Sequence, residues 1–226
     1  MSCASSSIFA ACAAFFSRSW AFALSLSACA VFAPDTAQRV VRVNVLVDVP
    51  FRARNPRWAE EARGLIEAAS DYYEREFDVR LLTQSVSPWP EKERLPSTVA
   101  LLARAQKEFP RQANAANHDL TVVFTAENVS RYFVAGRPRV DRIGNCSEGL
   151  GSYLIVPVSK VFSYRGLYAE PEVDVVVLVH ELGHIFGAEH VEDINSLMHE
   201  DFGYRTEFDA KNRAVIKKNR TCPFAK

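Results

Sequence analysis

Three of the five histidines in this 226-residue chain fall within residues 180–190, HELGHIFGAEH. On a helix, residues four apart lie one turn apart on the same face, so His180 and His184 present two imidazoles to a common point. Gly187 suits the left-handed conformation that ends a helix and turns the chain. After such a turn, His190 can return to the same point. The fold must therefore place the end of a helix where three imidazoles have room to meet.

Three neutral imidazoles with an open fourth position are the ligand set of a catalytic zinc ion, whereas structural zinc sites are closed by four protein ligands. Zinc lowers the pKa of its water to about 7 and polarises a carbonyl. Glu181 projects beside the ligands and can take a proton from that water. By chance, this spacing is expected in about one in 10⁵ sequences of this length and composition. We therefore expect one catalytic Zn²⁺ rather than three ordinary packing histidines.

The segment HELGHIFGAEH resembles the zinc-binding consensus of the metzincin metallopeptidases. In that family a methionine-containing turn lies beneath the metal. Met198, the only methionine besides Met1, follows His190 by eight residues, a short gap that is similar to that of the matrixin branch. The resemblance implies that the three histidines are metal ligands, that Glu181 is the general base and that Met198 forms the Met-turn.

The resemblance is specific over residues 180–198 and looser over the preceding part of the chain. The proline-containing continuation of the matrixin turn is missing, because His199-Glu200-Asp201 follow Met198. His118 stands alone, so no histidine set for a second, structural zinc is present upstream. The likeness therefore indicates a metzincin without assigning a named branch.

Residues 1–33 carry a single charge, Arg18, followed by an apolar run, and resemble an export signal or lipoprotein leader. Leu26–Cys29 is similar to a bacterial lipobox, in which Cys29 would be lipidated. A cut at the overlapping A-x-A-like site would instead release a secreted or periplasmic protein, and residues 8–33 are also long enough for an uncleaved anchor. All three alternatives place the domain outside the cytosol.

Beyond the leader, the chain has two cysteines, Cys146 and Cys222. An even pair in an oxidising compartment predicts a disulfide bond, which would close a long loop around the histidine cluster. The alternative is a pair of unpaired buried thiols.

The composition is that of a globular protein, with 48% hydrophobic and 24% charged residues. Its net charge of zero gives no support to nucleic acid or an anionic membrane as the partner. We expect a monomer that acts on a protein or peptide substrate and touches a membrane only through its N-terminal anchor. The length suits one catalytic domain, 38–226, with its cleft between 38–187 and 188–226.

The hydrophobic patterns predict an α+β fold of the metzincin-like zincin type. We expect a twisted, mixed β-sheet of about five strands packed on two long helices, and a small C-terminal subdomain that ends in a helix. In the helix predicted over Ser97–Phe109, we expect Val99, Leu102 and Phe109 to face inward. The other predicted elements are strands over Val41–Val49 (ended by Pro50), Asp78–Val86, Leu120–Thr125 and Tyr153–Val158, an irregular strand within Arg137–Ser152, and helices over Trp58–Phe77, Glu172–Phe186 and Lys211–Arg220.

Several further residues are weaker candidates for the site. His199 is adjacent to the methionine turn, and Tyr204 has the chemistry to donate a hydrogen bond to an oxyanion, although a surface role suits both. An acidic rim, whose members are Glu192, Asp193, Glu200 and Asp201, would favour basic substrate residues, and the alternative is ordinary solvated surface. An extended substrate would pair with the sheet edge near Arg137–Cys146 or Tyr153–Val158.

The sequence thus predicts a zinc-dependent metalloendopeptidase that hydrolyses peptide bonds in extracytoplasmic proteins or peptides. An exopeptidase is a variant of this prediction. One alternative is a surface-anchored binding protein with a non-catalytic structural zinc. Another is a zinc site of a different class, with Glu200 or Glu207 as the third ligand.

Overall fold

The computed structural model describes residues 38–54, 56–90, 97–111, 118–126, 138–158, 173–200 and 205–225. These residues belong to a compact unit, Thr36–Lys226. The predicted leader with Cys29, and the candidates Asp201 and Tyr204, lie outside the described residues. Within the described part, no helix has the length and apolar character needed to cross a membrane.

Four strands form a sheet in the order β2-β1-β3-β4, and all three pairings are parallel. Each strand overlaps one of the four regular strands predicted from the sequence. The strands are β1 (Arg39–Val47), β2 (Val79–Pro88), β3 (Leu120–Thr125) and β4 (Tyr153–Pro157).

The predicted irregular strand is reduced, in the described residues, to a short antiparallel contact along β4. The Ile155 N–H donates to the Arg139 carbonyl at 2.8 Å, the Asp141 N–H donates to the Tyr153 carbonyl at 3.0 Å, and Val140 bridges Leu154. The described sheet therefore has four parallel strands with one antiparallel bridge at its margin, rather than the five-stranded mixed sheet that we expected.

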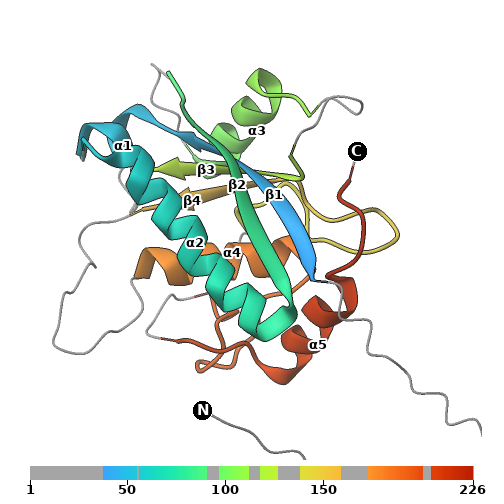
Figure 1. The fold of residues 1–226 in the computed structure, drawn as a ribbon. Coiled ribbons are helices and arrows are strands. Elements are labelled where there is room, and N and C mark those ends of the chain that lie inside the picture. The colour runs from blue at the N-terminus through green and yellow to red at the C-terminus, as the bar shows by residue number, and fades with distance from the viewer. Residues whose placement is uncertain are drawn as a thin grey trace, which may run out of the picture. The chain divides into compact units, whose positions relative to one another are not determined.

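Helices cover both faces of the sheet (Figure 1). The valines at odd positions of β1 pack on the face that carries α2 (Trp58–Phe77) and α4 (Val173–Ile185). On the other face, Leu46, Val123 and Ile155 pack with α3 (Thr98–Glu108). The alternation of Val41–Val49 predicted one buried face, and β1 follows it through Val45, with Leu46 the residue of the second face that is also buried.

The inward face of α3 differs from the one predicted. Leu101 and Ala105, one turn apart, are buried, whereas Val99 is 58% exposed. Because successive helical residues are rotated by about 100°, Val99 points nearly opposite to Leu101. Leu102 and Phe109 are partly buried against the same cluster, as expected.

A short helix, α1 (Val49–Arg54), follows β1 where the sequence predicted the end of a strand. The Asp48 carboxylate accepts a hydrogen bond from the Phe51 N–H at 2.8 Å and caps the first turn. Proline is tolerated in a first helical turn, so Pro50 belongs to this helix. The last helix is α5 (Ala210–Asn219), capped by the Asp209 side chain on the Asn212 N–H.

Candidate metal centre

The helix α4 carries two of the histidines through the interior of the molecule. His180 and His184 are 1% and 0% exposed, and apolar residues surround them on the same helix, including Leu178, Leu182 and Ile185. The Tyr73 hydroxyl of α2 donates to the Val179 carbonyl at 3.0 Å and links the two helices. A helix that is apolar on all sides is stable only when buried, so α4 holds its imidazoles in a fixed frame.

The three imidazoles converge through their Nε2 atoms. The Nε2 atoms of His180 and His184 lie 3.1 Å apart, those of His180 and His190 lie 3.1 Å apart, and those of His184 and His190 lie 3.2 Å apart. Ligands at tetrahedral positions around one zinc ion would be separated by about 3.3 Å at ordinary Zn–N distances. The spacing of the three nitrogens therefore suits a single shared ion.

The backbone determines which nitrogen of each buried ring carries the proton. His180 Nδ1 lies 2.5 Å from the Leu197 carbonyl, and His184 Nδ1 lies 2.7 Å from the Ala188 carbonyl. A carbonyl only accepts, so each Nδ1 is the donor and each Nε2 presents a lone pair. Two facing lone pairs cannot bond to each other, and a cation between them satisfies both.

Burial also keeps these rings neutral. It lowers the pKa of His180 well below its usual range, with the neighbouring His184 as a further cause. It lowers the pKa of His184 to about 4, although the hydrogen bond to Ala188 acts in the opposite direction. Neutral imidazole is the form that binds a metal, so both ligands are ready for binding at neutral pH.

Gly187 ends α4 and turns the chain toward the third ligand. Its φ is +97°, and a Cβ at this position would lie 2.4 Å from the Gly144 carbonyl oxygen. The Ala188 N–H donates to the Gly183 carbonyl at 2.9 Å, which closes the helix end. This left-handed turn was predicted from the sequence, and it brings His190 back to the two helical histidines.

Asn212 of α5 fixes the backbone next to His190. Its side-chain oxygen accepts from the Glu189 N–H at 3.0 Å, and its amide donates to the Glu189 carbonyl at 2.9 Å. The Asp209 carboxylate accepts from the same amide at 2.8 Å. This contact could not be predicted from the sequence, because a buried asparagine in a distant polar helix gives no local signal.

Met198 is fully buried directly beside α4. A Cβ at Gly183 would lie 2.8 Å from the Met198 sulfur and 2.9 Å from the Phe208 ring, so a larger residue here would displace these side chains. The Ser196 hydroxyl accepts from the Met198 N–H at 3.0 Å, and the Val191 N–H donates to the Met198 carbonyl at 3.1 Å. The turn that holds Met198 is thus bonded to the residue after His190.

Glu181 is buried beside the ligands and pairs with Arg139. The Arg139 N–H donates to one carboxylate oxygen at 2.9 Å, and its guanidinium donates to the other at 3.0 Å. Burial raises the pKa of Glu181 to about 7, while the nearby guanidinium lowers it. Arg139 was not predicted, since nothing in RPRVDR distinguishes this arginine from the exposed Arg142.

The weaker candidates that the structure describes do not join the three histidines. Among the described residues, the group able to hold a metal consists of His180, His184 and His190. His199 is half-buried on the turn after Met198, and the described members of the acidic rim, Glu192, Asp193 and Glu200, are exposed. Glu207 is also exposed, so the arrangement gives no support to a glutamate as the third ligand.

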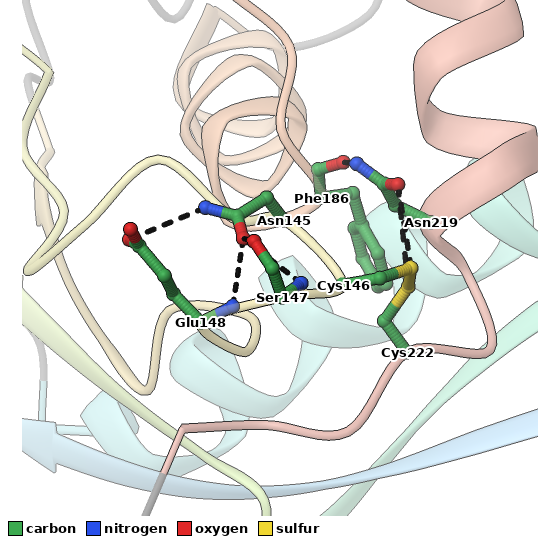
Figure 2. The surroundings of a disulfide bond; sticks show 7 residues. All are labelled: Asn145, Cys146, Ser147, Glu148, Phe186, Asn219 and Cys222. Atoms are coloured by element: carbon green, nitrogen blue, oxygen red, sulfur yellow. Dashed lines mark hydrogen bonds between the residues drawn. A yellow bond between two sulfur atoms is a disulfide. The ribbon is translucent and has the colours of Figure 1, made fainter.

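The predicted disulfide bond between Cys146 and Cys222 is present (Figure 2). It ties the loop after Gly144 to the end of α5. Beside it, the Asn219 amide donates to the Phe186 carbonyl at 3.0 Å, as Figure 2 shows. The crosslink and this hydrogen bond together anchor the end of α4, where the chain turns toward His190.

A cavity of about 810 Å³ lies between α2, the first half of α4 and residues 205–207. Apolar side chains that include Leu65, Val176 and Val179 line it. Its described lining contains Leu197, whose carbonyl contacts His180, but none of the three histidines. The cavity is therefore separate from the point where the imidazoles meet.

Three convergent imidazoles on an α+β frame define a metzincin-type zinc hydrolase. Residues 37–226 match the family model of metallo-peptidase family M12, in its reprolysin-type form. The chain therefore belongs to metallo-peptidase family M12, and the histidine triad holds its catalytic zinc. This match covers the whole described domain. The short gap from His190 to Met198, which resembled the matrixin branch, is a local feature and does not by itself assign the branch.

Proposed function

We propose that this M12 peptidase is an endopeptidase that cleaves extracytoplasmic proteins or peptides, with Glu181 as its general base. The observation that carries the proposal is the position of Glu181. This residue directly follows the ligand His180, is 1% exposed, and accepts hydrogen bonds from Arg139 on its carboxylate. When bound, zinc supplies Lewis-acid activation of water and of the peptide carbonyl.

The residues of the chain have separate tasks in this mechanism. The Glu181 carboxylate accepts a proton from the attacking water and passes it to the leaving amine. A pKa of about 7 suits a group that must both take and return a proton near neutrality. Met198 forms the packed floor that keeps the ligand helix and the turn after His190 in one arrangement.

Two features that are typical of exported proteins support an extracytoplasmic substrate. The Cys146–Cys222 bond is typical of oxidising compartments, and residues 1–33 resemble an export signal. We propose that the mature domain is either lipid-anchored through Cys29 or released. Mass analysis of the mature N-terminus separates these two forms.

The decisive test compares Glu181→Gln with the wild type on an unfolded protein substrate. We expect both proteins to bind one zinc per chain, while only the wild type cleaves. Glu67→Gln, which alters an exposed acid on α2, is the matched control and should cleave normally. Equal cleavage by Glu181→Gln and the wild type would exclude this base. Peptides with blocked ends should still be cut, because an endopeptidase does not need a free terminus.

A further inference from the structure

The proposed mechanism gives Glu181 a task but assigns none to Arg139, which forms a buried ion pair with it. The two side chains are 7% and 2% exposed. Arg139 reaches the carboxylate twice, with its backbone N–H on one oxygen and its guanidinium on the other, at 2.9 and 3.0 Å. Two donors on two oxygens fix both the rotamer of Glu181 and the plane of its carboxylate.

The fold determines where Arg139 lies. Its carbonyl accepts from the Ile155 N–H of β4 at 2.8 Å. Two residues further on, the Asp141 carboxylate accepts from the Ser152 and Tyr153 N–H groups at 2.9 and 3.1 Å. One end of the segment 139–144 is therefore fixed on the sheet.

The other end of this segment is fixed on α4. The Gly144 N–H donates to the His184 carbonyl at 2.9 Å. A Cβ at Gly144 would lie 1.9 Å from the Ile185 carbonyl oxygen, so glycine alone permits this approach. The segment 139–144 thus spans from β4 to the ligand helix, with Arg139 held over Glu181.

We propose that Arg139 is a positioning residue that holds the Glu181 carboxylate in one orientation for proton transfer during peptide hydrolysis. The proposal rests on the role of Glu181 as general base. A carboxylate oxygen has room for about two hydrogen bonds, so a base that accepts one bond from Arg139 on each oxygen can still meet a water molecule. Proton transfer requires hydrogen-bond reach, and a misplacement of about 1 Å can cost about 100-fold in rate.

The test compares Arg139→Ala with the matched control Arg142→Ala in the zinc-loaded, disulfide-bonded protein. Arg142 lies on the same segment, is exposed and donates to the Glu148 carbonyl. We expect Arg139→Ala to lower kcat at least ten-fold, with KM changed less than two-fold and one zinc retained per chain. Added guanidinium ion should restore part of kcat in this variant, whereas sodium at equal ionic strength should not. Arg142→Ala should match the wild type.

Three outcomes would overturn the proposal. An unchanged kcat shows that the base needs no such partner, and a higher kcat identifies the pair as a blocking contact. A raised KM at constant kcat makes Arg139 a substrate contact instead. If Arg139→Ala does not fold, Arg139→Lys keeps a buried cation but loses the planar donor, and wild-type kcat in that variant contradicts the proposal.

Failure of the base itself has a different signature. If Glu181→Gln cleaves like the wild type, the proposed function fails irrespective of Arg139. If Glu181→Gln is inactive while Arg139→Ala retains full kcat, the positioning role alone is wrong.

Discussion

Removal of the Cys146–Cys222 crosslink should cost this domain a large part of its stability. The two cysteines are separated by 76 residues. A crosslink removes loop-closure entropy from the unfolded chain, and for a loop of this size the chain-entropy relation gives about 15 cal/mol/K, or about 4.5 kcal/mol at 25 °C. Natural domains are stable by about 5–15 kcal/mol, so the loss is substantial.

The perturbation is the double variant Cys146→Ala/Cys222→Ala. Alanine is suitable because Cys222 is 4% exposed and a serine hydroxyl there would be buried. We expect urea unfolding of the zinc-free protein to shift to a lower midpoint, corresponding to a loss of about 4 kcal/mol. The slope of unfolding free energy against urea should increase, because the uncrosslinked unfolded chain exposes more surface.

Reduced wild-type protein is the control, and it should unfold like the double variant. A loss below about 1 kcal/mol with an unchanged slope would refute the entropic reasoning. A large loss with an unchanged slope would attribute the stability to contacts of the folded state, such as those around Asn219.

Three further predictions concern the turn and the third ligand. Gly187→Ala should destabilise the protein by about 3 kcal/mol, because the backbone there is left-handed and a Cβ would contact the Gly144 carbonyl oxygen. Gly64→Ala, in open space on α2, should be neutral or stabilising in the same urea titration. Asn212→Ala should cost about 2 kcal/mol and weaken zinc binding in a competition titration, because the backbone of Glu189 loses both hydrogen bonds; unchanged binding would show that His190 needs no such support. Elemental analysis should find no bound zinc in His190→Ala and one zinc per chain in Glu207→Ala, which alters an exposed residue. The reverse result would identify Glu207 as the third ligand.

Local periodicity predicted the elements that carry the metal ligands. The alternating valines of β1 and the mostly apolar α4 could be recognised because burial leaves a repeated pattern in the sequence. The i, i+4 histidines and Gly187 likewise report on one helix and its end. The disulfide followed from the count of cysteines rather than from geometry.

The supports of the site could not be predicted, because each depends on residues far apart in the sequence. Arg139 meets Glu181 across 42 residues, and Asn212 meets Glu189 across 23. Neither pair has a spacing rule, since contacts between separate elements depend on packing. The exposure of Val99 was misjudged for a related reason, because a short helix with apolar residues at consecutive positions allows more than one inward face.

The contact between Asn212 and Glu189 also imposes an order on biosynthesis. A growing polypeptide presents all three histidines before Asn212 and Cys222 have been added. At that stage α4 supplies a pair of imidazoles, but neither the amide that secures the neighbour of His190 nor the crosslink behind it has emerged from the ribosome. The ligand histidines are therefore synthesised first, and the contacts that support the turn at His190 are complete only after α5 and Cys222 have been added.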